Sequence, residues 1–147
     1  MENLKRENWI LIVLAQAHPN GLTPVQLQKS LFLLQKAFPS LFKEFYNFQP
    51  HNYGPFDVVV YEDANNLEDK KLLKQAGVEN RPWVKYYITR LGQQKVEKLL
   101  KRVDKKVVNY LKKLINWLQG LSFQELIISI YKKYPEYKVN SVFRELK

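Results

Sequence analysis

The sequence predicts a mainly α-helical protein of the α+β class, and two features lead to this prediction. Apolar residues recur at helical spacing over most of the chain, and residues 85–100 (KYYITRLGQQKVEKLL) start as a strand and end as a helix. Thr89 is suited to cap the basic helix that follows the aromatic and β-branched residues. A strand of this form, then two residues, a glycine and a basic amphipathic helix, is typical of the end of the wing in winged-helix domains. We therefore expect a winged-helix-like domain with a small β-hairpin wing and additional C-terminal helices.

Length and composition fit one domain. With 147 residues, 46% of them hydrophobic, the chain can bury one core, so we expect a single domain over 1–147, with a core (1–103) and a helical extension (104–147) packed on it. No apolar run approaches the roughly 20 residues of a bilayer span, and the first residues lack a signal-peptide cleavage pattern. We expect no membrane association and a cytoplasmic protein. The absence of cysteine excludes disulfides and thiol catalysis.

The first third of the chain predicts two helices. The first is expected over residues 3–17 and is ended by His18–Gly21. It should be amphipathic, with one apolar side formed by Leu4, Trp9 or Ile10, Val13, Leu14 and Ala17. The second helix is expected to begin after Thr23, which can act as its N-cap and form a capping box with Gln26. Pro24 then occupies the first helical position. The inner face of this helix is expected to be Leu27, Leu31, Leu34 and Phe38.

The middle of the chain is expected to hold a third helix and the wing. Residues 41–56 are rich in aromatic side chains without a helical pattern, which indicates a partly extended segment. A third helix is expected over about 55–67, beginning at the proline, and residues 68–76 should form one or two further helical turns that Gly77 closes. The strand is expected over 81–89, and the sequence does not place its hairpin partner.

Three helices are expected after the wing strand. The first ends near Arg102, the second covers about 105–118 and the third covers about 123–134. Ser122 and Glu125 form a second capping box at the start of the last helix. The apolar residues of these helices should cover the core. The apolar residues of these helices that do not cover the core could instead form the interface of a homodimer, an alternative that the sequence leaves open.

Positive charge gathers in one third of the chain. The net charge is +10, to which residues 1–80 contribute −1, residues 81–113 contribute +9 and residues 114–147 contribute +2. This distribution is expected of a surface that binds a polyanion such as double-stranded DNA. The alternative is an ordinary solvated helix face without a ligand. The residues expected to bind nucleic acid are Arg81, Lys85, Arg90, Lys95, Lys98, Lys101, Arg102 and Lys105.

Three motifs occur in an order that resembles a known family. They are Leu22–Phe32 (LTPVQLQKSLF), then Phe48 with Tyr53–Phe56 (YGPF), and then Tyr86–Gly92, which reads Tyr-x-Ile-Thr-x-x-Gly. Over about residues 3–100 the chain resembles the SocA-like antitoxin (Panacea) domain family and the YwgA-like proteins. The resemblance implies a winged-helix-like, mostly helical fold and no enzymatic chemistry. Because its members include antitoxins of toxin–antitoxin pairs, a cognate toxin is among the expected partners.

The helix in the recognition position has an unfavourable charge for DNA. In a helix-turn-helix a short turn joins the second and third helices, and the third lies in the major groove, whereas 17 residues, 39–55, separate the two candidates here. Between Phe56 and Asp69 there are five acids and no lysine or arginine, and phosphates would repel such a helix. If DNA binds, we expect the wing and the helix after it to make the contacts.

The turn before this acidic helix has two interpretations. Tyr53-Gly54-Pro55 is either a structural turn supported by aromatic side chains or part of a docking surface for a partner protein. The residues expected in such a surface are His51, Asn52, Tyr53, Asp57 and Glu62.

The sequence contains no convincing catalytic pattern. The two histidines have no partner at metal-ligand spacing, and the five glycines are scattered singly, so there is no phosphate loop. Asp57 with Glu68-Asp69-Lys70 resembles a nuclease carboxylate arrangement, but these positions are expected to be helical. We expect no catalytic residue, metal or cofactor. Two functions remain: a small winged-helix-like regulator or antitoxin-like protein that binds nucleic acid through 81–106, or a protein-interaction module that neutralises or delivers a partner without DNA binding.

Overall fold

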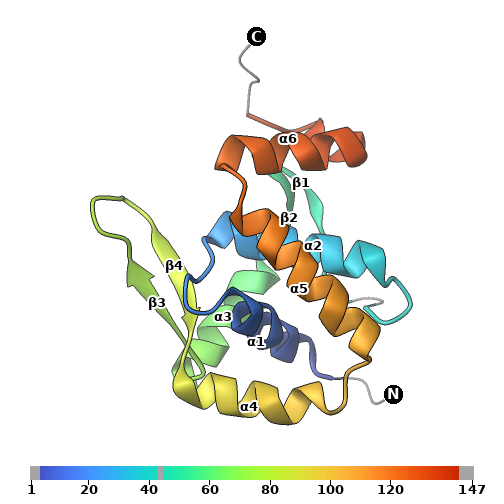
Figure 1. Ribbon diagram of the computed structural model, residues 1–147. Helices are drawn as coiled ribbons and strands as arrows, with labels where there is room; N and C mark the ends of the chain where they lie inside the picture. The colour runs from blue at the N-terminus through green and yellow to red at the C-terminus, as the bar shows by residue number, and fades with distance from the viewer. Residues whose placement is uncertain (1–3, 43–44, 143–147) are drawn as a thin grey trace.

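The computed structural model describes residues 4–42 and 45–142 (Figure 1). The α-helices are α1 (Arg6–Ala17), α2 (Pro24–Ala37), α3 (Val59–Asp69), α4 (Arg90–Leu100), α5 (Lys105–Gln119) and α6 (Phe123–Lys133). The strands form two antiparallel hairpins and are β1 (Gln49–His51), β2 (Gly54–Phe56), β3 (Leu73–Gly77) and β4 (Val84–Ile88). A 3-10 helix, η1, follows α6 at Pro135–Lys138. These elements confirm the expected mainly helical α+β class.

Helix α1 lies at the centre of the fold (Figure 1). Every residue from Asn8 to Leu14 is buried, and Leu11 and Ile12 are 0% exposed. Helices α2, α3, α4 and α5 and strand β4 all pack against it. The prediction of an amphipathic helix with a single apolar side is therefore wrong, because neighbouring elements cover the helix on all sides. The predicted start at residue 3 lies outside the described residues.

Helix α2 begins as the sequence predicts. The Thr23 hydroxyl accepts a hydrogen bond from the Gln26 amide (3.1 Å), and the Gln26 side chain accepts one from the Thr23 amide (2.9 Å). Phe38 is only partly buried, and its ring meets the ring of Tyr110 on α5 edge-on at 5.4 Å. The other predicted inner residues are buried as expected: Leu27, Leu31 and Leu34.

Strand β3 is the hairpin partner that the sequence did not place. It runs antiparallel to β4, with Leu73 opposite Ile88. The prediction that 68–76 is helical and closed by Gly77 is wrong, because α3 continues to Asp69 and the chain then pairs with β4. The aromatic and β-branched residues of β4 favour this pairing over the helical preference of the lysines and leucines before it.

A further extended residue joins this hairpin. Leu22 forms an isolated antiparallel bridge with Tyr86 of β4. The Tyr86 amide donates to the Leu22 carbonyl at 2.8 Å, and the Leu22 amide donates back at 3.0 Å. The strand itself is shorter than the predicted 81–89, since β4 begins at Val84. Residues 78–83 form the hairpin tip, which projects from the body of the molecule (Figure 1).

A second hairpin stands where the third helix is predicted to begin. β1 and β2 pair with His51 opposite Gly54, and Pro55 lies in β2. The prediction of a helix from Pro55 is wrong. Helix α3 begins at Val59, whose amide donates to the Asp57 carboxylate at 2.9 Å. Proline is tolerated in so short a two-stranded hairpin because it sits where no amide donor is required.

The strand-to-helix junction at Thr89 is confirmed. Its hydroxyl accepts a hydrogen bond from the Gly92 amide (3.0 Å) and donates one to the Lys71 carbonyl (2.7 Å), so it caps α4 and ties α4 to the start of β3. Leu91, in the first turn of α4, is 52% exposed and lies outside the core. Gly92 is buried instead, because α4 lies directly against the Leu72 carbonyl, where only a glycine fits.

The C-terminal helices cover two different parts of the fold. Helix α5 packs against α1 and α2, and its residues Leu111, Ile115 and Leu118 are at most 1% exposed. Helix α6 begins at the predicted capping box of Ser122 and Glu125 and packs with η1 on the β1–β2 hairpin. Within the described ranges, none of the helices is long and apolar enough to cross a bilayer.

Candidate functional site

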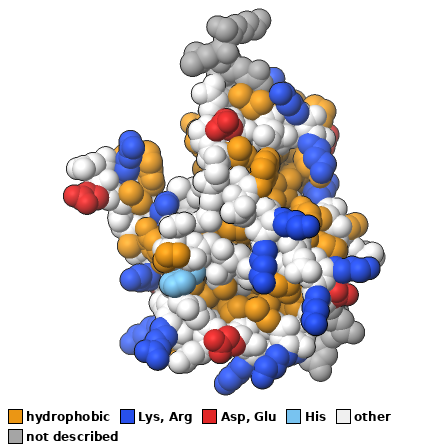
Figure 2. Space-filling view, viewed as in Figure 1, with side chains coloured by type: hydrophobic (Ala, Val, Ile, Leu, Met, Phe, Trp, Pro, Cys, Tyr) orange, Lys and Arg blue, Asp and Glu red, His pale blue; other side chains and the backbone are white. Residues whose placement is uncertain are grey.

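The exposed sides of α4 and α5 form a basic surface. From residue 90 to residue 113 the chain has nine lysines and arginines and two acids, Glu97 and Asp104, which gives a net charge of +7. The two helices follow one another along one side of the molecule, and Figure 2 shows lysine and arginine side chains over both. We call this the α4–α5 surface. The exposed cations between residues 90 and 113 are Arg90, Lys98, Lys101, Arg102, Lys105, Lys106, Lys112 and Lys113.

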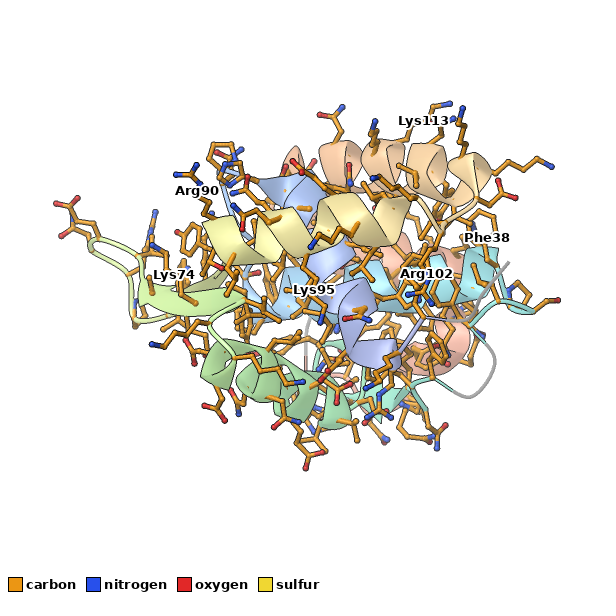
Figure 3. All side chains as sticks on the ribbon, turned by 90° about the horizontal axis from the view of Figure 1, so that it is seen from below. Phe38, Lys74, Arg90, Lys95, Arg102 and Lys113 are labelled. Carbon is orange, nitrogen blue, oxygen red and sulfur yellow. The ribbon has the colours of Figure 1, made fainter. Side chains whose placement is uncertain are left out.

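The cations of α4 do not all lie on one side of the helix. Lys101 follows Arg90 by about three turns, which brings both to the same side. Figure 3 shows Arg90 and Lys113 on one side of the two helices, and Lys95 and Arg102 on the opposite side of α4. Lys95 is also only half-exposed. The predicted nucleic-acid-binding residues of α4 therefore divide between two faces.

The acids of the α4–α5 surface offset little of its charge. The Asp104 carboxylate accepts a hydrogen bond from the Lys106 amide at 2.8 Å and caps α5. A carboxylate in this position also interacts with the positive end of its own helix. Glu97 is the other acid of this stretch and is exposed. The surface therefore remains strongly positive.

Two predicted nucleic-acid-binding residues lie on the β3–β4 hairpin instead. Arg81 is in the hairpin tip, and its guanidinium lies over the Trp83 ring at 5.4 Å. Lys85 is half-buried and donates a hydrogen bond to the Asn20 carbonyl at 3.1 Å. This bond ties β4 to the turn between α1 and α2, so Lys85 already has a structural partner.

Most acids around α3 bind groups within the protein. The buried Asp63 carboxylate accepts two hydrogen bonds from Arg6 (2.7 and 3.0 Å) and one from the Tyr46 hydroxyl (2.6 Å). The hydrogen bond to Asp63 raises the pKa of Arg6, and burial, together with Asp63, raises the pKa of Tyr46 far above its ordinary value. Glu68 accepts from the Gln75 amide at 2.7 Å. Helix α3 is thus less acidic on its surface than its sequence suggests.

The residues predicted to bind a partner protein have different surroundings. His51 is exposed and stacks on Phe56 at 4.6 Å. The Asn52 carbonyl accepts a hydrogen bond at 2.9 Å from the segment after η1. Asp57 is half-buried, and its carboxylate accepts hydrogen bonds from the amides of Val59 and Asn47, whereas Glu62 is exposed on α3. Only part of the predicted set is therefore available to a partner.

Tyr53 lines an apolar groove between the hairpin tip and the starts of α2 and α6. The groove has a volume of about 640 Å³. Tyr53, Trp83 and Phe123 line it and are 40–46% exposed. The rings of Tyr53 and Phe123 meet edge-on at 5.2 Å, and Figure 2 shows the hollow between the projecting hairpin and the body. We call this the aromatic groove. Sequence reasoning missed it because no local pattern places α6 beside the β1–β2 turn.

Lys29 is a second feature that sequence reasoning missed. It is 2% exposed, and its Nζ donates a hydrogen bond to the Pro55 carbonyl at 3.0 Å. Burial lowers the pKa of Lys29 to about 7. The one sequence signal is its position in α2 midway between the core residues Leu27 and Leu31, and that position predicts burial only if the helix is covered on a second side.

The basic surface, the aromatic groove and Lys29 are interpreted from the chemistry of their side chains. Among the residues that the structure describes, no three His, Asp or Glu side chains come together in a way that could hold a metal ion. A scan against protein-family models found no match to the chain, and a search of curated proteins found none either.

Proposed function

We propose that this protein binds nucleic acid through the α4–α5 surface, as a small winged-helix-like regulator or antitoxin-like protein. The observation behind this proposal is the net charge of +7 between residues 90 and 113, exposed along two adjoining helices. Lysines and arginines that neutralise phosphates release condensed counterions, and this release supplies most of the non-specific affinity for DNA. Seven exposed cations remain on this surface without Arg102, which Figure 3 shows on the opposite side of α4, and they are sufficient for several such contacts.

The order of the elements supports the winged-helix-like part of the proposal. Helix α1, the Leu22 bridge, helices α2 and α3 and the β3–β4 hairpin follow one another in the order expected of a helix-turn-helix followed by a wing. The β1–β2 hairpin lies between α2 and α3 in this order. The same order agrees with the resemblance to the SocA-like antitoxin domains and the YwgA-like proteins, which we retain as part of the proposal.

Helix α3 is an unfavourable recognition helix in this proposal. The third helix of a helix-turn-helix enters the major groove, but α3 has no lysine or arginine and exposes Glu62 and Asp69. Phosphates would repel these carboxylates. We therefore assign the phosphate contacts to α4 and α5, with Arg81 at the hairpin tip as an additional contact.

Fluorescence anisotropy with a labelled DNA duplex tests the proposal between about 50 and about 200 mM salt. The test variant is Lys98→Glu/Lys105→Glu, which reverses two exposed cations of the α4–α5 surface. We expect it to bind at least about tenfold more weakly than the wild type. Its dependence of log affinity on log salt should be shallower by about 2, because two phosphate contacts are lost.

Lys132→Glu/Lys133→Glu is the matched control, since it makes the same charge change on exposed positions of α6. This control should keep the wild-type salt dependence. Absence of any binding at about 50 mM salt, or equal losses in the two variants, would contradict the proposal.

A second candidate function is protein binding through the aromatic groove. We propose a partner helix with an apolar face and an acidic edge as its occupant. Exposed aromatic side chains around one groove are typical anchors for an apolar helix face. The net charge of +10 favours an acidic partner, and the positive ends of α2 and α6 at the groove add to this preference.

Affinity capture from the producing cells, followed by binding measurements with the purified partner, tests this candidate. The groove variant Trp83→Ser/Phe123→Ser should lose an acidic partner that the wild type binds in a fixed ratio. Trp117→Ser is the control, because Trp117 is 43% exposed on α5 and does not line the groove. A partner that the groove variant retains, or that both variants lose, binds elsewhere.

A further inference from the structure

Lys29 is buried without an acidic partner. Among the lysines that the structure describes, Lys29 alone is buried, and it is 2% exposed. Lysines are almost never fully buried in proteins unless they are paired. None of the described acids forms a salt bridge with this lysine, and its Nζ donates to the Pro55 carbonyl at 3.0 Å instead.

The amine of Lys29 is chemically distinct from the exposed amines. Burial alone lowers its pKa to about 7, so a large fraction of the amine is uncharged near neutral pH. An ordinary lysine, with a pKa of about 10.4, is almost entirely an ammonium ion at that pH. The uncharged amine is a nucleophile, and the ammonium ion is not.

Lys29 lines a small pocket beside the β1–β2 hairpin. The pocket has a volume of about 200 Å³, and His51, Phe56 and Tyr61 are its aromatic walls. At about 30 Å³ for a water-sized volume, it accommodates a molecule of roughly six non-hydrogen atoms. Gly54 adopts a φ of +100° in the hairpin turn, a conformation that favours glycine, and a Cβ there would lie 3.6 Å from Lys29 Cε, so the turn lies beside the lysine.

We propose that Lys29 is a covalent binding site for a small neutral aldehyde, which enters this pocket and forms an imine with Nζ. The nitrogen lone pair attacks the carbonyl carbon, and the proton that the nitrogen loses reaches the carbonyl oxygen to give a carbinolamine. The nitrogen lone pair then forms the C=N bond as the hydroxyl group leaves, and the second proton that the nitrogen loses joins this hydroxyl group to give water. One amine and one aldehyde thus give one imine and one water, with no oxidant, reductant or cofactor.

The walls of the pocket favour a neutral ligand over an anion. A carboxylate or phosphate would lose its hydration in a pocket where, among the described residues, His51 is the only basic lining side chain besides Lys29. Aromatic rings, in contrast, offer a planar carbonyl compound a surface on which to pack. The hydrogen bond from Nζ to the Pro55 carbonyl holds one N–H against β2 and leaves the lone pair to point elsewhere.

Reductive alkylation of the full-length wild type at pH 7 tests the proposal. The probe is propionaldehyde with sodium cyanoborohydride, which converts the imine to a stable amine, and peptide mass spectrometry locates the adduct. We expect Lys29 to be alkylated at least about tenfold faster than the exposed lysines, because a far larger fraction of its amine is uncharged. An alkylation rate equal to or below that of the exposed lysines overturns the proposal.

The size of the aldehyde distinguishes the pocket from transient opening of the fold. 2-Naphthaldehyde exceeds the pocket volume and should modify exposed lysines but not Lys29. Equal modification of Lys29 by both aldehydes would show that unfolding exposes the amine, and this outcome also overturns the proposal. The preference for Lys29 should disappear in concentrated guanidinium chloride. These measurements are independent of nucleic-acid binding, so their failure leaves the proposal for the α4–α5 surface intact.

Discussion

The two buried charged residues of the described chain, Asp63 and Lys29, are accommodated in opposite ways. Asp63 accepts hydrogen bonds from both Arg6 and Tyr46, so its carboxylate is well satisfied as a charged group. Lys29 donates to a neutral carbonyl oxygen and has no counter-charge. The protein therefore keeps one buried ion paired and lets the other lose its proton.

Lys29 should make the stability of the protein depend on pH. Its pKa is about 7 in the folded chain and 10.5 in the reference state, so between these values the unfolded chain binds more protons than the folded chain. The free energy of unfolding therefore rises with pH across this window. From about pH 7 to about pH 9 we expect an increase of about 2 kcal/mol, measured by urea denaturation.

Lys29→Met is the reference for this measurement, because methionine fills a similar volume without a charge. The increase in the free energy of unfolding with pH is measured for both proteins, and the value for Lys29→Met is subtracted from that for the wild type. The difference is the contribution of Lys29, free of those from the surrounding titratable groups His51, Tyr53, Tyr61 and Tyr131. Tyr86, whose pKa burial raises to about 12, contributes equally in both proteins. Parallel pH profiles for the two proteins would show that the Lys29 amine stays charged when the protein folds.

Single residues are predictable from the sequence where their partners are close in the chain. The capping residues Thr23, Thr89 and Ser122 bind amides three residues away, so a local pattern identifies them. The partners of Lys29 and Asp63 lie far along the chain. Their pairing depends on which segments the fold brings together, and a local pattern contains no information about that.

At the scale of elements, Gly92 fixes how closely α4 approaches β3. A Cβ at this position would overlap the Leu72 carbonyl oxygen and lie 2.7 Å from Ile88 Cγ1. Gly92→Ala should therefore push α4 away from the hairpin and lower the free energy of unfolding by about 2 kcal/mol or more. Urea denaturation monitored by circular dichroism measures this loss.

Gly120→Ala is the matched control at the C-terminal end of α5. A Cβ there would meet the Trp117 carbonyl at 3.4 Å, an ordinary contact distance, and the residue has a φ of −81° that alanine adopts freely. We expect the free energy of unfolding to change by no more than about 1 kcal/mol. The change is an increase if the lower conformational entropy of alanine in the unfolded chain dominates. Similar losses in both variants would mean that α4 can shift to accommodate the extra methyl group.

The elements that the sequence misplaces are those that long-range pairing decides. Residues 68–76 have a composition that suits a helix, yet residues 73–76 lie in β3 because β4 offers a partner with strong strand preference. Pro55 suits the first turn of a helix, yet it lies opposite Pro50 in a hairpin. The long helices, whose capping and periodicity are local, are predicted to within a few residues.

At the scale of the whole molecule, the charge count locates the basic region but not its shape. The sequence places the excess of cations in residues 81–113. The fold divides this region between the projecting β3–β4 hairpin and the α4–α5 surface, and it turns Lys95 and Arg102 to another side of α4 (Figure 3). The aromatic groove joins four segments far apart in the chain, at residues 23–26, 53, 83 and 121–126. Neither arrangement follows from charge or periodicity along the sequence.

The packing of α1 predicts which C-terminal helix the fold requires. Helix α5 covers α1 and α2 with residues that include Leu111, Ile115 and Leu118, all at most 1% exposed. Each buried leucine or isoleucine contributes about 2 kcal/mol, so the loss of α5 is comparable to the whole net stability of a domain, about 5–15 kcal/mol. A chain of residues 1–103 should therefore fail to unfold cooperatively on heating, with circular dichroism as the measurement.

A chain of residues 1–120 keeps α5 and loses α6 and η1, which pack on the β1–β2 hairpin. It should unfold cooperatively at a lower temperature than the full chain. A cooperative transition in the chain of residues 1–103 would show that α1 finds sufficient cover without α5.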